Sequence, residues 1–449
     1  MRRLAAALGG LLLLAGCASF SDDGGFATVA DLTRNRTGQT PAYQRGAEPG
    51  RATRARVAEL LQAPLSADDA VELALLNSPA LQARFAELGI AEADLVQAGR
   101  LRNPRIGLGR LAGGGVVEVD RSLMFDLLGL ITLPTVRTLE QARFEQAQWQ
   151  AAADAVALAT EARQAHTQAV AAAQLLAYQQ QVQAAADAAG ELARRMVAAG
   201  NFSALAQMRE QAFHADAAAQ LVRARHQAVA QRERLVRVLG LADATALTLP
   251  ERLPDLPEAP LALPDAEQTA MDQRLDVLMA RRSAESTAQA LGLARSSRFI
   301  NVLDLGPQDQ HATGERTRRG LAVELELPLF DFGSARSARA EASYWQALHR
   351  TAQVAVAARS EVREATSAYR SAYELARYYR DEVVPLKKRI ADESLLRYNG
   401  MLASVFELLA DAREQITSVT AAVEAQRDFW LADAQLQATL TGGATASSP

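Results

Sequence analysis

Residues 320–333 read GLAVELELPLFDFG, and the alternation within this stretch decides the fold. Apolar and acidic side chains take turns along it: Val323, Glu324, Leu325, Glu326 and Leu327. Successive side chains of a strand point to opposite faces, so this pattern predicts a strand with one apolar face and one wet face. Together with residues 299–305 it predicts a strand pair, joined by a solvated loop over 306–319.

The same order of segments occurs earlier in the chain. Leu81 matches Leu278 at an offset of 197, and Arg209-Glu210-Gln211 matches Arg413-Glu414-Gln415 at an offset of 204. Between about residues 134 and 199 the sequence has almost no Pro or Gly, which predicts a helix far longer than usual. The chain is therefore interpreted as a tandem duplication of helix, two strands and a long helical hairpin.

This duplication divides the chain into segments. The fold class is mainly α with a small β part. The segments are a signal peptide with its cysteine-containing cleavage motif at 1–17, an extended tether at 18–65, a first repeat at 66–240 (strands about 103–127, hairpin about 134–239), a Pro-rich linker at 241–265, a second repeat at 266–440 (strands about 297–329, hairpin about 334–440) and a disordered tail at 441–449.

The N-terminus carries an export signal. Arg2 and Arg3 precede a short apolar run, which is typical of a secretory signal peptide and too short to span a membrane. Residues 14–17, Leu-Ala-Gly-Cys, resemble the bacterial lipobox, in which the cysteine is acylated. The resemblance implies that Cys17 is lipidated, with palmitate among its acyl chains, and that the protein is sorted to the outer membrane. The alternative is a plain signal peptide with an incidental cysteine.

Composition and motifs exclude several classes of function. The 449 residues include 48 Lys and Arg against 52 Asp and Glu, so bulk charge does not favour nucleic-acid binding. Cys17 is the only cysteine, and none of the five histidines pairs with another ligand at metal-binding spacing. The sequence shows no nucleophile–base constellation and no cofactor motif. We therefore expect no enzyme activity, no metal and no cofactor.

The number of predicted strands constrains how they are used. Four strands cannot close a membrane barrel, because small barrels need about eight. An open four-stranded sheet also leaves two bare edges. Either the strands are covered in solution, or several chains pool them. Three chains would give twelve strands around one pore, with the long helices forming an attached tube.

The sequence resembles the TolC family of outer-membrane efflux ducts, in its lipoprotein branch. The resemblance covers about residues 66–440 and rests on four segments: 70–79 (AVELALLNSP), 91–104 (AEADLVQAGRLRNP), 327–333 (LPLFDFG) and 397–412 (RYNGMLASVFELLADA). It implies a homotrimer with a 12-stranded outer-membrane barrel, anchored in outer-membrane lipid, and a long periplasmic α-helical barrel. It also implies docking to a periplasmic adaptor protein and an inner-membrane pump, with passive export and no chemistry.

The resemblance places the periplasmic gate near the ends of the helical hairpins. The candidate residues are Gly200, Asn201, Tyr398, Gly400, Glu407 and Asp411. The two glycines are expected to let the chain reverse, and Tyr398 matches a position where the family often has a gating tyrosine. The two carboxylates are four residues apart, so threefold symmetry would make each an acidic ring that favours cations. The alternative for them is a solvated helix face.

Two other classes of protein remain open at this point. A periplasmic adaptor would show one helical hairpin and a long β-rich remainder, which the duplication argues against. A coiled-coil lipoprotein scaffold without a pore would leave the alternating strand at 320–329 without a purpose.

Overall fold

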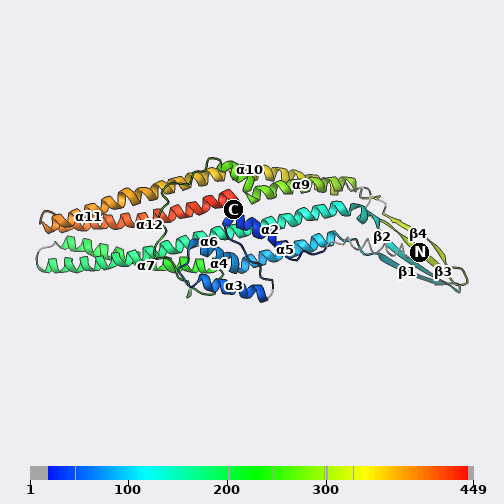
Figure 1. Ribbon diagram of the computed structural model, residues 1–449, viewed down its shortest axis with the longest axis horizontal. Helices are drawn as coiled ribbons and strands as arrows, with labels where there is room; N and C mark the ends of the chain where they lie inside the picture. The colour runs from blue at the N-terminus through cyan, green and yellow to red at the C-terminus, as the bar shows by residue number, and fades with distance from the viewer. Residues whose placement is uncertain are drawn as a thin grey trace. The chain divides into compact units, whose positions relative to one another are not determined.

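The computed structural model describes residues 19–442, apart from residues 46, 201, 202, 246, 298, 300, 301 and 327. Cys17, Asn201 and Leu327 thus lie outside the described residues. No helix in the described part of the chain combines the length and apolar character needed to cross a membrane. The elements, shown in Figure 1, are α2 Phe26–Thr37, α3 Ala47–Leu60, α4 Ala67–Asn77, α5 Pro79–Ala98, β1 Arg105–Gly113, β2 Val116–Asp126, α6 Leu127–Ala198, α7 Ala204–Val238, α8 Ala266–Gln273, α9 Leu275–Ser296, β3 Leu303–Ala312, β4 Arg318–Leu325, α10 Ser334–Tyr378, the π-helical turn η1 Tyr379–Val383, α11 Val384–Asn399 and α12 Val405–Thr441.

The elements group into two compact units. The first comprises Arg84–Ala151, Asp276–Val356 and the described residues of Met1–Val29; the second comprises the described residues of Ala30–Ala83, Ala152–Leu275 and Ala357–Pro449. The helices α6 and α10 each contribute residues to both units. The mainly helical fold with a small sheet, predicted from the sequence, is confirmed.

The first unit holds one antiparallel sheet, in the order β1-β2-β3-β4. The central pair β2–β3 joins the strands of the two repeats. The predicted loop over 306–319 is wrong over most of its length, since β3 continues to Ala312 and β4 begins at Arg318. Polar residues fit these strands because the ladder still pairs Gln310 with Arg318, on a face that the other strands also keep polar.

The cross-strand register assigns every strand residue to one of two faces. The apolar face carries, among others, Ile106, Leu108, Leu123, Phe125, Leu303, Leu305, Leu321, Val323 and Leu325. The polar face carries, among others, Glu118, Asp120, Ser122, Asp126, Asp304, Gln308, Gln310, Arg318 and Glu324. Most of the large side chains on the apolar face are exposed in the single chain. The predicted division into one apolar and one wet face therefore extends over β2, β3 and β4, whereas the second face of β1 carries mainly glycine, with Arg105 and Leu111.

The N-terminal segment corrects one expectation. Residues 18–65 were expected to form an extended tether, but they contain the helices α2 and α3. Val29 and Leu65 are buried, and Arg56 of α3 pairs with Glu72 of α4 at 2.7 Å between Nε and Oε1. Their apolar residues are too sparse to show a helical period, so contacts with distant parts of the chain stabilise these helices.

The helical segment that opens the first repeat consists of two helices. A capping box between Ser66 and Asp69 begins α4. Ser78 then adopts an extended conformation with ψ 117°, and α5 begins at Pro79. A residue before proline disfavours the helical conformation, which explains why α4 ends at Asn77 and a new helix begins at Pro79.

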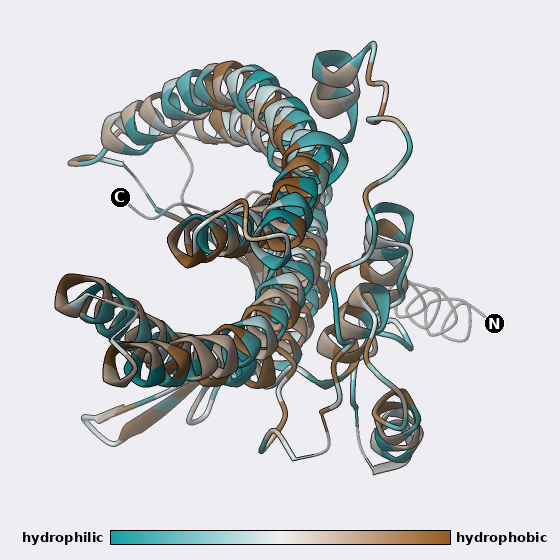
Figure 2. Ribbon diagram, turned by 90° about the vertical axis from the view of Figure 1, so that its left-hand side faces the viewer, coloured by the Kyte–Doolittle hydropathy of each residue, from teal (hydrophilic) through white to brown (hydrophobic). Residues whose placement is uncertain are grey.

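The second unit contains the far ends of the two long helical hairpins, α6–α7 and α10–α12. Figure 2 looks toward the hairpin ends, where the helices lie side by side along an open arc with hydrophobic and hydrophilic residues mixed along them. In the second hairpin, Tyr369, Tyr373 and Phe429 form an aromatic cluster with ring centroids 5.5 and 5.7 Å apart. The π-helical turn η1 immediately precedes α11, in whose first turn Pro385 lies.

The Pro-rich linker, residues 241–265, is bound to the long helices by side chains. Tyr373 donates a hydrogen bond to the Glu258 carbonyl at 2.9 Å, and Trp430 donates one to the Pro254 carbonyl at 3.0 Å. The backbone N–H of Leu253 donates to Gln174 of α6 at 3.1 Å. The described linker residues before α8 form no helix or strand, and these side chains bind part of the backbone that is left without a ladder.

Candidate functional site at the hairpin ends

The first hairpin reverses at Gly200. This glycine has a φ of 74°, and its N–H bonds to the Val197 carbonyl at 2.9 Å. A Cβ atom there would meet nothing within 4 Å, so backbone conformation, and not crowding, favours glycine. After the turn, the Ser203 hydroxyl accepts a hydrogen bond from Ala206 N at 3.2 Å and caps α7.

The second hairpin reverses one residue later than predicted. Gly400 ends α11 with a φ of −80°, which any residue adopts, while Met401 takes the left-handed conformation with a φ of 61°. Met401 N bonds to the Tyr398 carbonyl at 2.9 Å, and Leu402 N to the Arg397 carbonyl at 2.8 Å. This is the Schellman pattern, whose left-handed position usually holds glycine. Here a methionine with an almost fully exposed side chain holds that position.

Glu407 forms part of a helix cap. Its backbone N–H donates to Ser404 Oγ at 3.3 Å, and its carboxylate accepts from Ser404 N at 2.9 Å. The two bonds make a capping box at the start of α12. The sequence signal, Ser-x-x-Glu over 404–407, was present but unused in the sequence interpretation.

The other candidates lie close by, with separate partners. The Ser394 hydroxyl of α11 donates a hydrogen bond to the carboxylate of Asp411 on α12. Tyr398 is half-buried in the last turn of α11. The structure therefore brings Tyr398, Gly400, Glu407 and Asp411 to one hairpin end, but Glu407 and Asp411 bind different serines.

Sequence reasoning missed an ion pair between the two hairpins. Arg413 Nη2 of α12 lies 2.6 Å from Glu210 Oε1 of α7, and Glu210 is only 3% exposed. The Arg413 guanidinium also lies over the Phe213 ring, 4.5 Å from its centroid. Two residues on helices from different repeats must meet to form this site, so spacing along the chain could not reveal it.

The two caps give a second way to compare the hairpins. Counting from the capping serines, Glu210 lies seven residues after Ser203, and Asp411 lies seven residues after Ser404. This count pairs Glu210 with Asp411, whereas the sequence offset of 204 pairs Arg209 with Arg413. Each hairpin therefore carries an acid at the same distance from its cap.

Large apolar side chains are exposed around the two turns. They are Leu205, Met208, Met401, Leu402 and Phe406. Exposed apolar groups gathered at one end of an element are a feature of docking surfaces.

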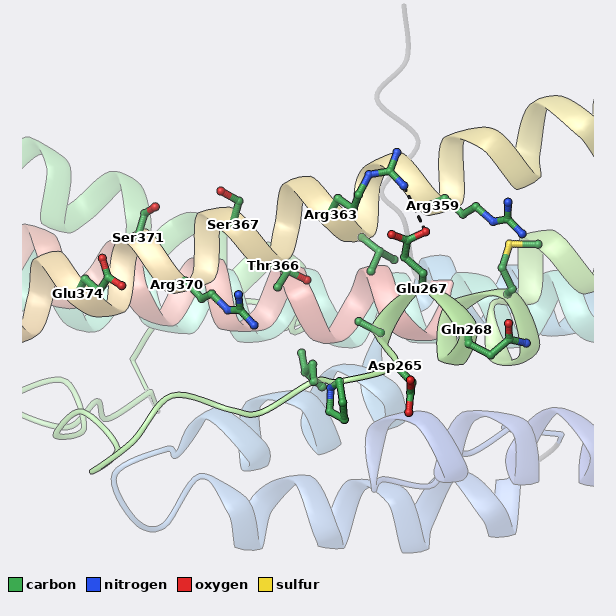
Figure 3. Close-up of a pocket in the computed structure, with 15 residues that line it drawn as sticks. Asp265, Glu267, Gln268, Arg359, Arg363, Thr366, Ser367, Arg370, Ser371 and Glu374 are labelled. Atoms are coloured by element: carbon green, nitrogen blue, oxygen red, sulfur yellow. Dashed lines mark ion pairs between the residues drawn. The ribbon is translucent and has the colours of Figure 1, made fainter.

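A separate pocket of about 610 Å³ lies beside α8 and α10 (Figure 3). Arg363 and Glu267 pair across it at 3.2 Å. Its charged lining is balanced between three arginines and three carboxylates: Arg359, Arg363, Arg370, Asp265, Glu267 and Glu374. Such a lining gives the pocket no net preference for anions or cations. The described residues also contain no group of His, Cys, Asp and Glu side chains that could hold a metal ion.

Comparison with known proteins gives a fold assignment. No protein-family model matches the chain, and no curated protein matches it. Among solved structures, the outer-membrane channel OprN is 20% identical, with 92% of this chain and 95% of OprN covered at a TM-score of 0.70. The outer membrane protein VceC from Vibrio cholerae is 18% identical, with 84% and 96% covered at a TM-score of 0.69.

A third structure agrees with these two. CusC, a protein that forms a transmembrane channel, is 16% identical to this chain. The comparison covers 84% of this chain and 92% of CusC at a TM-score of 0.70. The likeness therefore covers most of this chain and nearly the full length of the compared channels. The chain has the fold of the TolC family of outer-membrane efflux channels, as the sequence resemblance predicts.

Proposed function

We propose that this chain is the outer-membrane exit duct of a tripartite efflux system. It would export substrates passively when docked to a periplasmic adaptor and an inner-membrane pump. The observation that carries the proposal is the four-stranded sheet, which has one exposed apolar face and one polar face. That arrangement suits a barrel wall with lipid outside and water inside, and the fold is that of outer-membrane channels.

The proposal includes a homotrimer. Within the described sheet, β1 and β4 each pair with one neighbour only, so each leaves a free edge. Three copies would join these edges into a 12-stranded barrel, and their hairpins would form the periplasmic α-helical barrel. Signal peptidase would remove residues 1–16, and acylated Cys17 would anchor the mature chain in the outer membrane.

The hairpin ends would form the periplasmic gate and the docking surface. The Glu210–Arg413 pair holds α7 and α12 together and would keep this end closed until the adaptor binds. The exposed apolar side chains around the turns would contact the adaptor. The proposal assigns no chemical step to the duct itself, so the energy for export would come from the inner-membrane pump.

Purified full-length protein tests the proposal in planar bilayers and by electron microscopy. We expect a threefold particle with a hollow tube, and discrete ion-conducting events after insertion. A monomeric rod that gives no conductance would instead support a periplasmic coiled-coil scaffold or adaptor without a pore.

A further inference from the structure

Arginines form a row on the apolar face of the sheet, where apolar residues give way to charged ones. The register sets Leu108, Arg121, Asp309 and Arg319 side by side across β1, β2, β3 and β4. The next row toward the hairpin turns contains Arg110, opposite Val119. These three arginines share a face with the exposed leucines, valines and phenylalanine of the same strands.

The apolar residues below this row form a continuous band. It begins with the pair Leu303–Leu325 and ends with the row that contains Ile106 and Leu321. From Leu303 to Pro307 the band rises about 14 Å along the strand, at ~3.4 Å per residue, and the arginine row follows two residues later. The arginine row therefore marks the end of the apolar band on this face. In an outer-membrane barrel, lipid headgroups lie where the apolar band ends.

The three arginines are available to bind a ligand. Arg110, Arg121 and Arg319 are exposed, and none of them forms an ion pair within the described part of the chain. Asp309, between Arg121 and Arg319, offsets one positive charge and leaves a net charge of two on this edge of the face. His311 lies in the same row as Arg110.

We infer that Arg110, Arg121 and Arg319 bind the phosphate groups of anionic membrane lipids around the outer rim of the barrel. Guanidinium groups recognise phosphate by paired, charge-assisted hydrogen bonds. Below them, the apolar band would contact the acyl chains of the same lipids. The inference rests on the proposed outer-membrane function and adds a lipid preference to it.

Arg318 provides a matched control on the neighbouring position. Arg318 lies on β4, next to Arg319, but the register puts it on the polar face opposite Gln310. Its guanidinium pairs with Glu315 at 2.8 Å. Because adjacent strand residues point to opposite faces, Arg318 would face the water-filled interior. Replacing it removes the same charge from the same strand without changing the lipid-facing side.

The test compares lipid retention by full-length protein in nanodiscs of phosphatidylcholine mixed with phosphatidylglycerol. Native mass spectrometry counts the phosphatidylglycerol molecules that stay bound. We expect the wild type to be enriched in phosphatidylglycerol, Arg121→Gln/Arg319→Gln to lose this enrichment by on the order of tenfold, and Arg318→Gln to retain it. Arg121→Lys/Arg319→Lys, which keeps both charges, should retain part of it.

Several outcomes would overturn the inference. Equal enrichment in the wild type and in Arg121→Gln/Arg319→Gln would show that these arginines do not select the lipid. Displacement of phosphatidylglycerol by millimolar inorganic phosphate would show a site for free anions and not for lipid. Insertion without any lipid preference would contradict this inference alone, whereas failure to insert into any bilayer would contradict the proposed function as well.

Discussion

The guanidinium of Arg413 on α12 lies 2.6 Å from the carboxylate of Glu210 on α7, and this pair joins the two helical hairpins. Glu210 is 3% exposed, whereas about a third of the Arg413 side chain is exposed. The pair is therefore partly buried: the carboxylate of Glu210 is shielded from solvent, and the guanidinium of Arg413 is partly exposed to it. A buried charge is tolerated when its partner is present and becomes costly when that partner is removed.

Arg413→Ala should open this contact and destabilise the protein. We expect a loss of about 2–4 kcal/mol in the free energy of unfolding, because Glu210 would keep a buried charge without its partner. This loss is at the low end of the range for buried ion pairs, because solvent reaches the Arg413 side chain. Denaturation by urea, followed by circular dichroism, measures the change. In bilayers the variant should also leak more current in the closed state.

Arg209→Ala serves as the control for this prediction. Arg209 precedes Glu210 on α7 and is exposed, so its removal changes the net charge equally but leaves the buried pair intact. Equal destabilisation by the two substitutions would contradict a specific role for the Arg413–Glu210 pair.

Substitutions at the two turns should have unequal effects. Gly200→Ala should cost about 1 kcal/mol, because Gly200 has a φ of 74°. Gly400→Ala should be close to neutral, since the φ of Gly400 is −80° and an added Cβ would meet only ordinary contacts at 3.5 Å or more. Met401→Gly should stabilise the second turn by up to about 1 kcal/mol. Thermal or urea unfolding of the three variants measures these differences; a larger loss at Gly400 than at Gly200 would refute the assignment.

The acidic-ring hypothesis can be separated from helix capping. Glu407→Gln/Asp411→Asn removes both charges, while glutamine can still complete a capping box. If the ring acts in the gate, this variant should reduce the preference for cations over anions in bilayer recordings, with little loss of stability. Glu407→Ala should in addition cost about 0.5–1 kcal/mol, because it removes half of the cap. An unchanged reversal potential in Glu407→Gln/Asp411→Asn would eliminate the ring.

Acid should weaken the second unit through His166. Burial lowers the pKa of this histidine below its ordinary value of 6.5, despite the nearby carboxylates of Asp69 and Asp68 and the hydrogen bond between its Nε2 and the Leu65 carbonyl. A lowered folded-state pKa means that the unfolded chain takes up the proton first. Stability is therefore unaffected well above pH 6.5, and it falls as the pH drops through 6.5 toward the lowered value.

His166→Gln should remove this part of the pH dependence, because glutamine can donate to the Leu65 carbonyl without titrating. The measurement is the free energy of unfolding between pH 8 and pH 5 for the wild type and the variant. His226→Gln, at an exposed position on α7, is the control and should keep the wild-type slope. Parallel profiles for the wild type and His166→Gln would contradict the assignment.

The sequence predicts an element well when its pattern lies within that element, and poorly when the element depends on contacts with distant segments. The alternation at 320–325 and the long stretch with almost no Pro or Gly predicted that strands and long hairpins exist, since each signal lies within one element. The helices α2 and α3 were missed because they depend on burial of single residues such as Val29 against distant segments. The strand residues Gln308 and Gln310 were interpreted as a loop because their polarity reflects the wet face of the sheet.

At the candidate site, too, the features set by a local pattern could be predicted and those set by contacts between helices could not. The cap at Ser404 could have been predicted from Ser-x-x-Glu alone. The left-handed turn was assigned to Gly400 because glycine is the usual residue, and the hydrogen-bond pattern of the chain puts it on Met401 instead. The burial of Glu210 depends on which helices become neighbours, and no short-range pattern carries that information.

The Pro-rich linker, residues 241–265, connects the two hairpins through side-chain hydrogen bonds as well as along the chain. Its backbone is held by Gln174 of the first repeat and by Tyr373 and Trp430 of the second. The linker is also packed, because Leu253 lies against Val170 and Trp430. A substitution in one hairpin can therefore displace a segment to which the other hairpin is bonded. We expect that neither half, expressed alone, would fold as an independent module.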